Sequence, residues 1–310
     1  MTKKMDAEEI VKRYCSSERN FSKISFIQVN LSKVDLRGAD FSYANLSSAN
    51  LSKANLSNTN LIWVDLNRAD LQYSNINNGN LAYASLFWAN LSNASLRHAN
   101  LSCARLNHAN LESVCLSEAN LTEVSLEEAC LKKADLTHAN LFKANLKGTD
   151  FTGSYLDDAN LAQTNLEGAI LLNALLRRAD LEGAQLNQAI LSKADLTEAY
   201  LVVSVLNDVD LRDTILHRAS LELATLVNAD IKNADLSKAS LFKANLKEAI
   251  LEGANLAEAD LRHANLKNAY LSGVDFSRTR VRGALFTNAK GLTYQQKSWL
   301  RENGALNLHE

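Results

Sequence analysis

A large apolar residue stands at every fifth position of this chain. From Phe21 to Phe286, in steps of five, all 54 positions hold Leu, Phe, Ile or Val, without an insertion. Two residues before each of them the residue is nearly always small, most often Ala, and the other three positions are mostly polar. A period of five matches neither the 3.6-residue period of a helix nor the two-residue period of a flat strand.

The five-residue period is typical of a chain that turns a corner in each unit and points one large and one small side chain inward. A single unit of this kind cannot bury its large residue, so successive turns of the chain must stack to build a continuous interior. The small residue has a steric role, because a larger side chain there would crowd a thin, close-packed interior. The sequence therefore predicts a solenoid.

The units, for example "ANLSSANLSKANL" at residues 44–56, closely resemble the A-(D/N)-L-x-x motif of the pentapeptide-repeat family. The resemblance covers residues 21–289 and implies an all-β solenoid, the right-handed quadrilateral β-helix, with about 13 coils of four pentapeptides. The expected organisation is one structural domain with an N-terminal capping helix in residues 1–20, the repeats in 21–289, and a C-terminal capping helix and tail in 290–310.

Both ends of the chain carry signals for short capping helices. Asp6 with Glu9 and Thr293 with Gln296 have the spacing of capping boxes, and Gly304 is a typical helix stop. Such helices would cover the terminal coils, whose unpaired edges would otherwise be open to other chains. The alternative, by resemblance to some family members, is that the C-terminal helix docks two subunits. The apolar residues expected to face the coils are Ile10, Val11, Tyr14, Trp299 and Leu300.

Charge and composition exclude several classes of protein. The formal charge of −2 disfavours a nucleic-acid partner, which would need a basic stripe. The charged N-terminus lacks the apolar core of a secretory signal, and no apolar run is long enough to cross a membrane, so we expect a cytoplasmic protein. The spacing of the four cysteines fits neither a disulfide framework nor a zinc site. No cofactor, metal or small-molecule substrate is expected.

Outward side chains 20 residues apart should lie above one another. One such column nearly alternates in charge and contains His98, Glu118, His138 and Asp158, which predicts a ladder of exposed ion pairs. A metal site on the two histidines is the weaker interpretation, because they lie two coils and roughly 10 Å apart on a surface without a pocket. A second column, of asparagines from Asn60 to Asn160, predicts a ladder of amide hydrogen bonds.

Tyr43, Trp63 and Tyr83 form a column of large aromatic residues near the N-terminal end. Stacked rings stiffen a solenoid, with roughly 0.5–1.5 kcal/mol from each pair. Exposed Trp and Tyr are also enriched at protein interfaces. The two interpretations remain open, and the column is a candidate protein-binding surface.

Apolar residues also occupy outward positions between residues 170 and 227. Clustered apolar side chains on a surface favour a binding partner or self-association. Single exposed apolar residues, in contrast, are common and arise by sequence variation on a tolerant surface. Column spacing places Ile170 on Ile190 and Val203 on Leu223. The candidate protein-binding residues here are Ile170, Leu172, Ile190, Val203, Val205, Leu223 and Val227.

These observations favour a non-catalytic interaction scaffold or regulatory binding protein with an unidentified protein partner or a second copy. The stretches "EEIVKRYCSSERNF" and "NAKGLTYQQKSWLRENGAL" resemble the ends of cyanobacterial pentapeptide-repeat proteins, one of which, a heterocyst-differentiation regulator, acts by binding other proteins. The alternative implied by the family is a DNA-mimicking inhibitor or protector of a type II topoisomerase. The balanced charge and the lack of loops depart from that subgroup.

Overall fold

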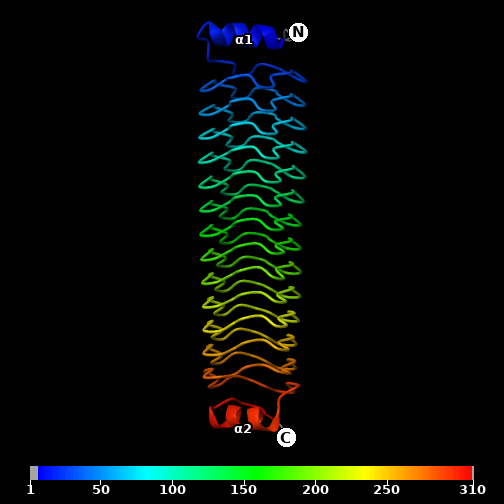
Figure 1. Cartoon of the computed structure of the whole chain (residues 1–310), viewed down its shortest axis with the longest axis vertical. Coiled ribbons are helices and arrows are strands. Elements are labelled where there is room, and N and C mark those ends of the chain that lie inside the picture. Colours follow the sequence, from blue (N-terminus) through cyan, green and yellow to red (C-terminus); the bar gives the residue numbers. More distant parts are fainter. Residues whose placement is uncertain (1–5, 309–310) are drawn as a thin grey trace. The chain divides into compact units, whose positions relative to one another are not determined.

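The computed structural model describes residues 6–308 and divides the chain into two compact units. Unit 1 is Met1–Tyr155 and unit 2 is Leu156–Glu310. Within each unit the chain winds through successive coils of similar size (Figure 1). The expectation of one structural domain, and of about 13 coils in the whole chain, stays a prediction.

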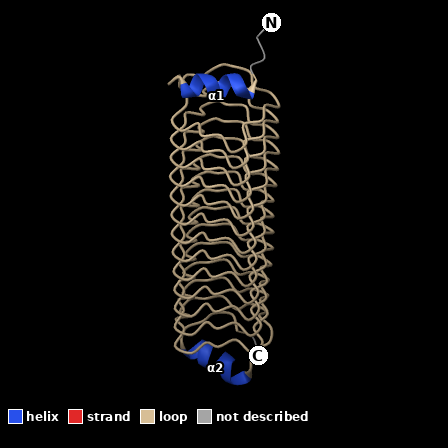
Figure 2. Cartoon of the chain, turned by 45° about the horizontal axis from the view of Figure 1, so that its top comes forward, coloured by secondary structure: helices blue, strands red, loops and turns tan. Residues whose placement is uncertain are grey.

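Each coil takes 20 residues and has four sides. Parallel bridges join residues 20 apart in four separate ladders, which in unit 2 include Val205 to Thr225, Asp210 to Asp230, Ile215 to Asp235 and Ser220 to Ser240. Each side contributes only one bridged residue, so both units consist of short bridged segments and turns rather than long strands (Figure 2). Backbone bonds between coils are short, as between the Leu46 amide and the Asp65 carbonyl at 2.7 Å. The four ladders agree with the quadrilateral β-helix expected from the repeat.

Every corner of the coil is a tight turn of the same kind. In the turn that begins at Phe41, the Ala44 amide donates to the Phe41 carbonyl at 3.0 Å, and Tyr43 has a φ of 59°. A positive φ at the third turn residue is the signature of a type II turn. We call this third residue, two positions after each large apolar residue, the corner residue.

The Asn or Asp that precedes each large apolar residue has a structural role in these turns. The Asn45 side-chain oxygen accepts from the Ser47 amide at 2.9 Å, and Asp65 and Asp275 accept in the same way from Asn67 and Ser277. A carboxylate or amide oxygen that caps an amide two residues later stabilises a turn. This bond within the turn gives the Asn or Asp of the repeat a role that the sequence analysis did not predict, in addition to the predicted hydrogen bonds between coils.

The interior of each unit is filled by the large and small residues of the repeat. The leucines of the five-residue period are buried, and the alanines two positions before them are buried beside them. Phe21 and Phe41 stack at 5.4 Å between ring centroids in consecutive coils. The prediction of one large and one small inward side chain per unit is confirmed.

Two short helices lie at the ends of the units, α1 (Ala7–Cys15) in unit 1 and α2 (Tyr294–Glu302) in unit 2 (Figures 1 and 2). The structure shows the Asp6 half of the first predicted capping box, with the Glu9 amide donating to Asp6 at 2.9 Å. The second box is complete. Ile10 and Leu300 are buried, and Gly304, which follows the C-cap residue Asn303, has a φ of 81°, as a helix stop requires.

Among residues 6–308, the structure contains no helix with the length and hydropathy that a membrane crossing needs. All four cysteines are free thiols.

Candidate protein-binding surfaces

An apolar surface surrounds one corner of unit 2. Val203 and Leu223 are corner residues of consecutive coils and are 45% and 50% exposed. Val205 lies on the side that follows this corner, where it is bridged to Thr225, and Val227 lies at the next corner. Both are half-buried. We call Val203, Val205, Leu223 and Val227 the 203 surface.

Two further apolar residues adjoin the 203 surface, and one of them, Tyr200, was not identified from the sequence. Tyr200 is exposed on the side that precedes the Val203 corner, and Val202 is half-buried within the same turn. Tyr200 is bridged to Ser220, which precedes the corner of Leu223 in the next coil. The same column arithmetic that found Val203 would have found Tyr200, had tyrosine been counted as apolar in that region.

Ile170, Leu172 and Ile190 form a separate group. Ile170 is bridged to Ile190, as predicted, and Ile190 is bridged in turn to Asp210. That ladder is distinct from the ladder of Val205 and Thr225, so the group lies on another side of the coil. Ile190 is exposed, whereas Ile170 and Leu172 are half-buried. This side directly follows the corner of Val227, because the ladder continues from Asp210 to Asp230.

The backbone at Val203 is unusual. As a corner residue, Val203 has a φ of 53°. A β-branched side chain is a genuine outlier in this left-handed region, which Gly, Asn and Asp enter most readily. Because Val203 is exposed, it gains little packing energy to offset this backbone strain. The fold itself therefore does not account for valine at this position.

The aromatic column of unit 1 contains one tight pair. Trp63 and Tyr83 stack with ring centroids 4.6 Å apart and planes 6° from parallel, which confirms the predicted stacking of these two. Tyr43 is exposed at the preceding corner of the same column. All three remain about half exposed, so stacking buries only one face of each ring in the pair.

A second aromatic pair was not predicted. Trp88 stacks on His108 at 4.4 Å, and Trp88 is the most exposed tryptophan among the described residues at 60%. His108 also lies 3.2 Å from Glu128 in the next coil. The signal was present in the sequence, since residues 88 and 108 are one coil apart.

Parts of the polar ladders predicted from column spacing are confirmed. His98 lies 3.4 Å from Glu118 in unit 1, and Arg178 pairs with Asp158 in unit 2. The Asn100 amide donates to Asn80 at 3.0 Å, and Asn120 donates to Asn100 at 3.2 Å. Within residues 6–308, no group of three or more His, Cys, Asp or Glu side chains is arranged to hold a metal ion.

Comparison with known proteins gives matches over most of the chain. Eight segments match the family described as pentapeptide repeats, at residues 20–58, 44–82, 80–117, 119–158, 154–192, 204–241, 239–278 and 249–290. No curated protein matches the sequence.

Solved structures with similarity to this chain include two from the cyanobacterium Nostoc PCC 7120. HetL, a pentapeptide repeat protein involved in heterocyst differentiation regulation, is 32% identical, with 86% of this chain and 96% of HetL covered and a TM-score of 0.25. The pentapeptide repeat protein alr5209 is 37% identical, with 32% of this chain and 80% of alr5209 covered and a TM-score of 0.31. QnrB1, a plasmid-mediated fluoroquinolone resistance protein, is 16% identical, with coverage of 78% and 95% and a TM-score of 0.30.

Proposed function

Because the chain belongs to the pentapeptide repeat family and has its right-handed quadrilateral β-helix, we propose that it is a non-catalytic interaction protein. The 203 surface is its binding site for a partner protein. The aromatic column Tyr43, Trp63 and Tyr83 and the group Ile170, Leu172 and Ile190 are secondary candidates for the same kind of contact.

The observation that supports this role is the placement of Val203 and Leu223. Both are about half exposed, and both occupy left-handed corners where the backbone favours small polar residues or glycine. Their apolar area would be removed from water only in a complex, at roughly 25 cal/mol per Å². An apolar cluster that costs the free protein stability is typical of a binding surface.

A non-catalytic role agrees with the way each unit is built. The interior is occupied by Leu and Ala, so reactive side chains would have to act on the open exterior. Catalytic sites need a concave, partly dehydrated pocket with converging polar groups. The coil corners turn outward and give the repeats no loop from which to form one.

The test replaces Val203, Leu223 and Val227 together by Asn, which suits a left-handed corner at the first two positions. We expect the triple variant to keep its circular dichroism spectrum and to lose partners that the unchanged protein captures from its native cell extract. Gln163→Asn with Lys243→Asn is the matched control, because these residues occupy the same corner column. If the triple variant retained every partner, the 203 surface would not be the binding site.

The same variants separate a second copy from a different partner. Light scattering during gel filtration gives the mass of the purified protein. A dimeric or larger mass that falls to the monomer mass only in the triple variant would identify self-association through the 203 surface. A monomeric mass for both proteins, with partner loss in the triple variant, would identify a different protein.

The type II topoisomerase alternative has its own test. DNA mimicry requires a strongly negative surface. Here Arg178 and Arg218 alternate with Asp158 and Glu198 along one corner column, and two of these pairs are in contact. We expect DNA gyrase to supercoil DNA at its full rate with the protein in excess, whereas inhibition would favour the mimic.

A further inference from the structure

Positive charge is concentrated at the C-terminal end of unit 2. Residues 261–308 contain eight basic and two acidic residues, a formal charge of +6, in a chain whose total is −2. The basic residues are Arg262, Lys267, Arg278, Arg280, Arg282, Lys290, Lys297 and Arg301. Such an asymmetry within one chain favours an anionic partner.

Four of these arginines line one hollow of about 540 Å³. The hollow is bounded by Arg262, Arg278, Arg280, Arg282 and Trp299, together with Thr279, Val281 and Asn303. Its size is within the range of ligand sites. The lining charge is cationic, because no acidic residue belongs to it.

One carboxylate beside the hollow shows how two of the guanidinium groups are held. Asp260 accepts from Arg262 Nε at 2.9 Å and from Nη2 at 2.7 Å, and Arg280 Nη2 lies 3.0 Å from the same carboxylate. Burial opposes ionisation of Asp260, but the bonds from Arg262 and the charge of Arg280 outweigh it and keep its pKa below the ordinary value. One negative charge is thus shared between two positive ones, which leaves the group with a net positive charge.

Arg278 and Arg282 add two further positive charges. Both are exposed, and among the described residues neither has an acidic partner within ion-pair distance. Arginine guanidinium groups bind carboxylates in a bidentate fork, as Arg262 does with Asp260. The two arginines are therefore available for external carboxylates.

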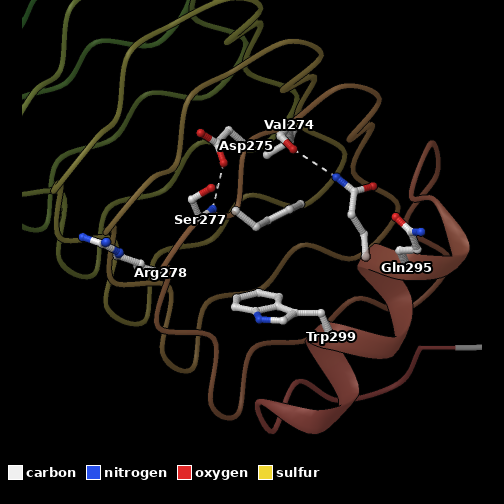
Figure 3. Close-up of a pocket in the computed structure, with 8 residues that line it drawn as sticks. Val274, Asp275, Ser277, Arg278, Gln295 and Trp299 are labelled. Atoms are coloured by element: carbon white, nitrogen blue, oxygen red, sulfur yellow. Dashed lines mark hydrogen bonds between the residues drawn. The ribbon is translucent and has the colours of Figure 1, made fainter.

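Trp299 forms the remaining wall and is fixed in place by α2. Gln296 Nε2 donates to the Val274 carbonyl at 3.0 Å, and Leu300 is buried, so both neighbours anchor the helix to the last coils. Figure 3 shows the half-buried indole of Trp299 facing the coil that carries Ser277 and Arg278, beside a second hollow of about 350 Å³. Trp and Arg are the residues most enriched at the centres of protein interfaces.

We propose that this hollow, the arginine site, binds an acidic segment of a partner protein, with its carboxylates on Arg278 and Arg282 and an adjacent side chain against Trp299. The inference rests on the proposed role in protein binding but uses a surface separate from the 203 surface. A protein segment is favoured over nucleic acid because the charge is confined to one end. The corner column of Arg278 carries Glu258 one coil before it and Glu198 further along, and these charges would repel a duplex laid along the coils.

The test measures fluorescence anisotropy of labelled hexaglutamate with the full-length protein, with labelled hexaglutamine as the uncharged probe. We expect hexaglutamate alone to bind, and its affinity to fall as salt is added. The variant Arg278→Gln with Arg282→Gln should weaken binding about tenfold, since charge-assisted bidentate bonds are lost. Trp299→Leu should weaken it by a smaller factor.

Arg218→Gln is the matched control. Arg218 is a corner residue in the same column as Arg278, but it is already paired with Glu198 at 3.3 Å. We expect this variant to change the affinity by less than about twofold. If the double glutamine variant unfolds, Arg278→Lys with Arg282→Lys keeps the charge and should still weaken binding about threefold through loss of the planar fork.

Three results would overturn the arginine site. Hexaglutamine could bind as well as hexaglutamate, the arginine variants could bind hexaglutamate like the unchanged protein, or oligothymidylate could bind more tightly with the same dependence on Arg278 and Arg282. The last result would assign the site to phosphates instead of carboxylates. Failure here would leave partner capture through the 203 surface untouched, so the two proposals fail separately.

Discussion

At the scale of single residues, the corner position accepts many residue types, and it also holds several of the exceptions to the polar pattern of the outer surface. All 54 corner residues have a positive φ, yet only eight of them are glycine, and Lys, Asn and Glu fill many of the others. Left-handed backbone costs an ordinary L-residue roughly 1–2 kcal/mol. Each corner pays this cost for a turn that places the next side chain inward.

Val203→Asn should therefore stabilise the protein. Asn relieves the β-branched clash at a φ of 53° and removes only a half-exposed side chain, so we expect a gain of about 0.5–1 kcal/mol. Urea unfolding of the single variant measures it. A loss of stability would mean that Val203 packs within the free protein more than its exposure indicates.

Ile76 and Gly79 should be energetically coupled. A Cβ added at Gly79 would lie 2.8 Å from Ile76 Cγ2 and 2.9 Å from the Ile76 carbonyl, closer than real contacts allow. We expect Gly79→Ala to cost about 1–3 kcal/mol, as overpacking does. In an Ile76→Leu background, which restores the usual Leu and Ala pair, the same change should cost less than half as much. Equal costs in both backgrounds would exclude the coupling.

At the scale of elements, each helix depends on tertiary contact because nine residues are too few for a stable isolated helix. The Tyr14 hydroxyl donates to the Arg37 carbonyl at 2.9 Å and ties α1 to the coils of unit 1. The complete capping box at Thr293 and Gln296 starts α2, and the Gln296 amide group also reaches Val274. One side chain thus both caps the helix and attaches it to the last coils.

Thr293→Ala should destabilise α2 by about 1 kcal/mol through loss of an N-cap. We expect amide hydrogen exchange to rise first at residues 295–302 and to remain slow in the coils. Thr293→Ser, which retains the hydroxyl, is the control. If exchange rose equally throughout unit 2, the cap would be part of a larger cooperative element.

At the scale of the whole chain, paired carboxylates predict the response to acid. Hydrogen bonds from Arg212 hold the pKa of Asp210 below its usual 3.8, and hydrogen bonds from Ser277 do the same for Asp275. A carboxylate with a lowered folded-state pKa stabilises the fold above its unfolded pKa, and this contribution is lost as the pH falls through the folded value. We expect a thermal midpoint that is steady down to about pH 5 and falls below about pH 4.

Asp210→Asn isolates the contribution of one carboxylate to the dependence of the thermal midpoint on pH. Asn can still accept the backbone bond from Arg212, which Asp210 accepts at 3.1 Å, so the variant removes mainly the charge. Its thermal midpoint should be lower than that of the unchanged protein near neutral pH, and the two curves should converge in acid. Curves that stay parallel across the range would show that the pair contributes no pH-dependent stability.

Much of the candidate binding surface could be predicted from spacing alone. Because the repeat has no insertion, residues 20 apart stack, and this gave the stack of Trp63 on Tyr83 and the bridge of Ile170 to Ile190. Tyr200 and the Trp88 and His108 pair were equally accessible but were missed. The arginine site had a signal as well, the +6 charge of residues 261–308, which the balanced total of −2 conceals.

The sequence by itself determined the coil, since a five-residue period with alternating large and small inward residues can bury its leucines only by stacking. It also determined the two helix starts, because capping is a local interaction. Tertiary structure alone decided that Trp299 faces the coil of Arg278. The reason is that α2 lies outside the repeat, so no period relates its side chains to those of the coils, and only packing brings them together.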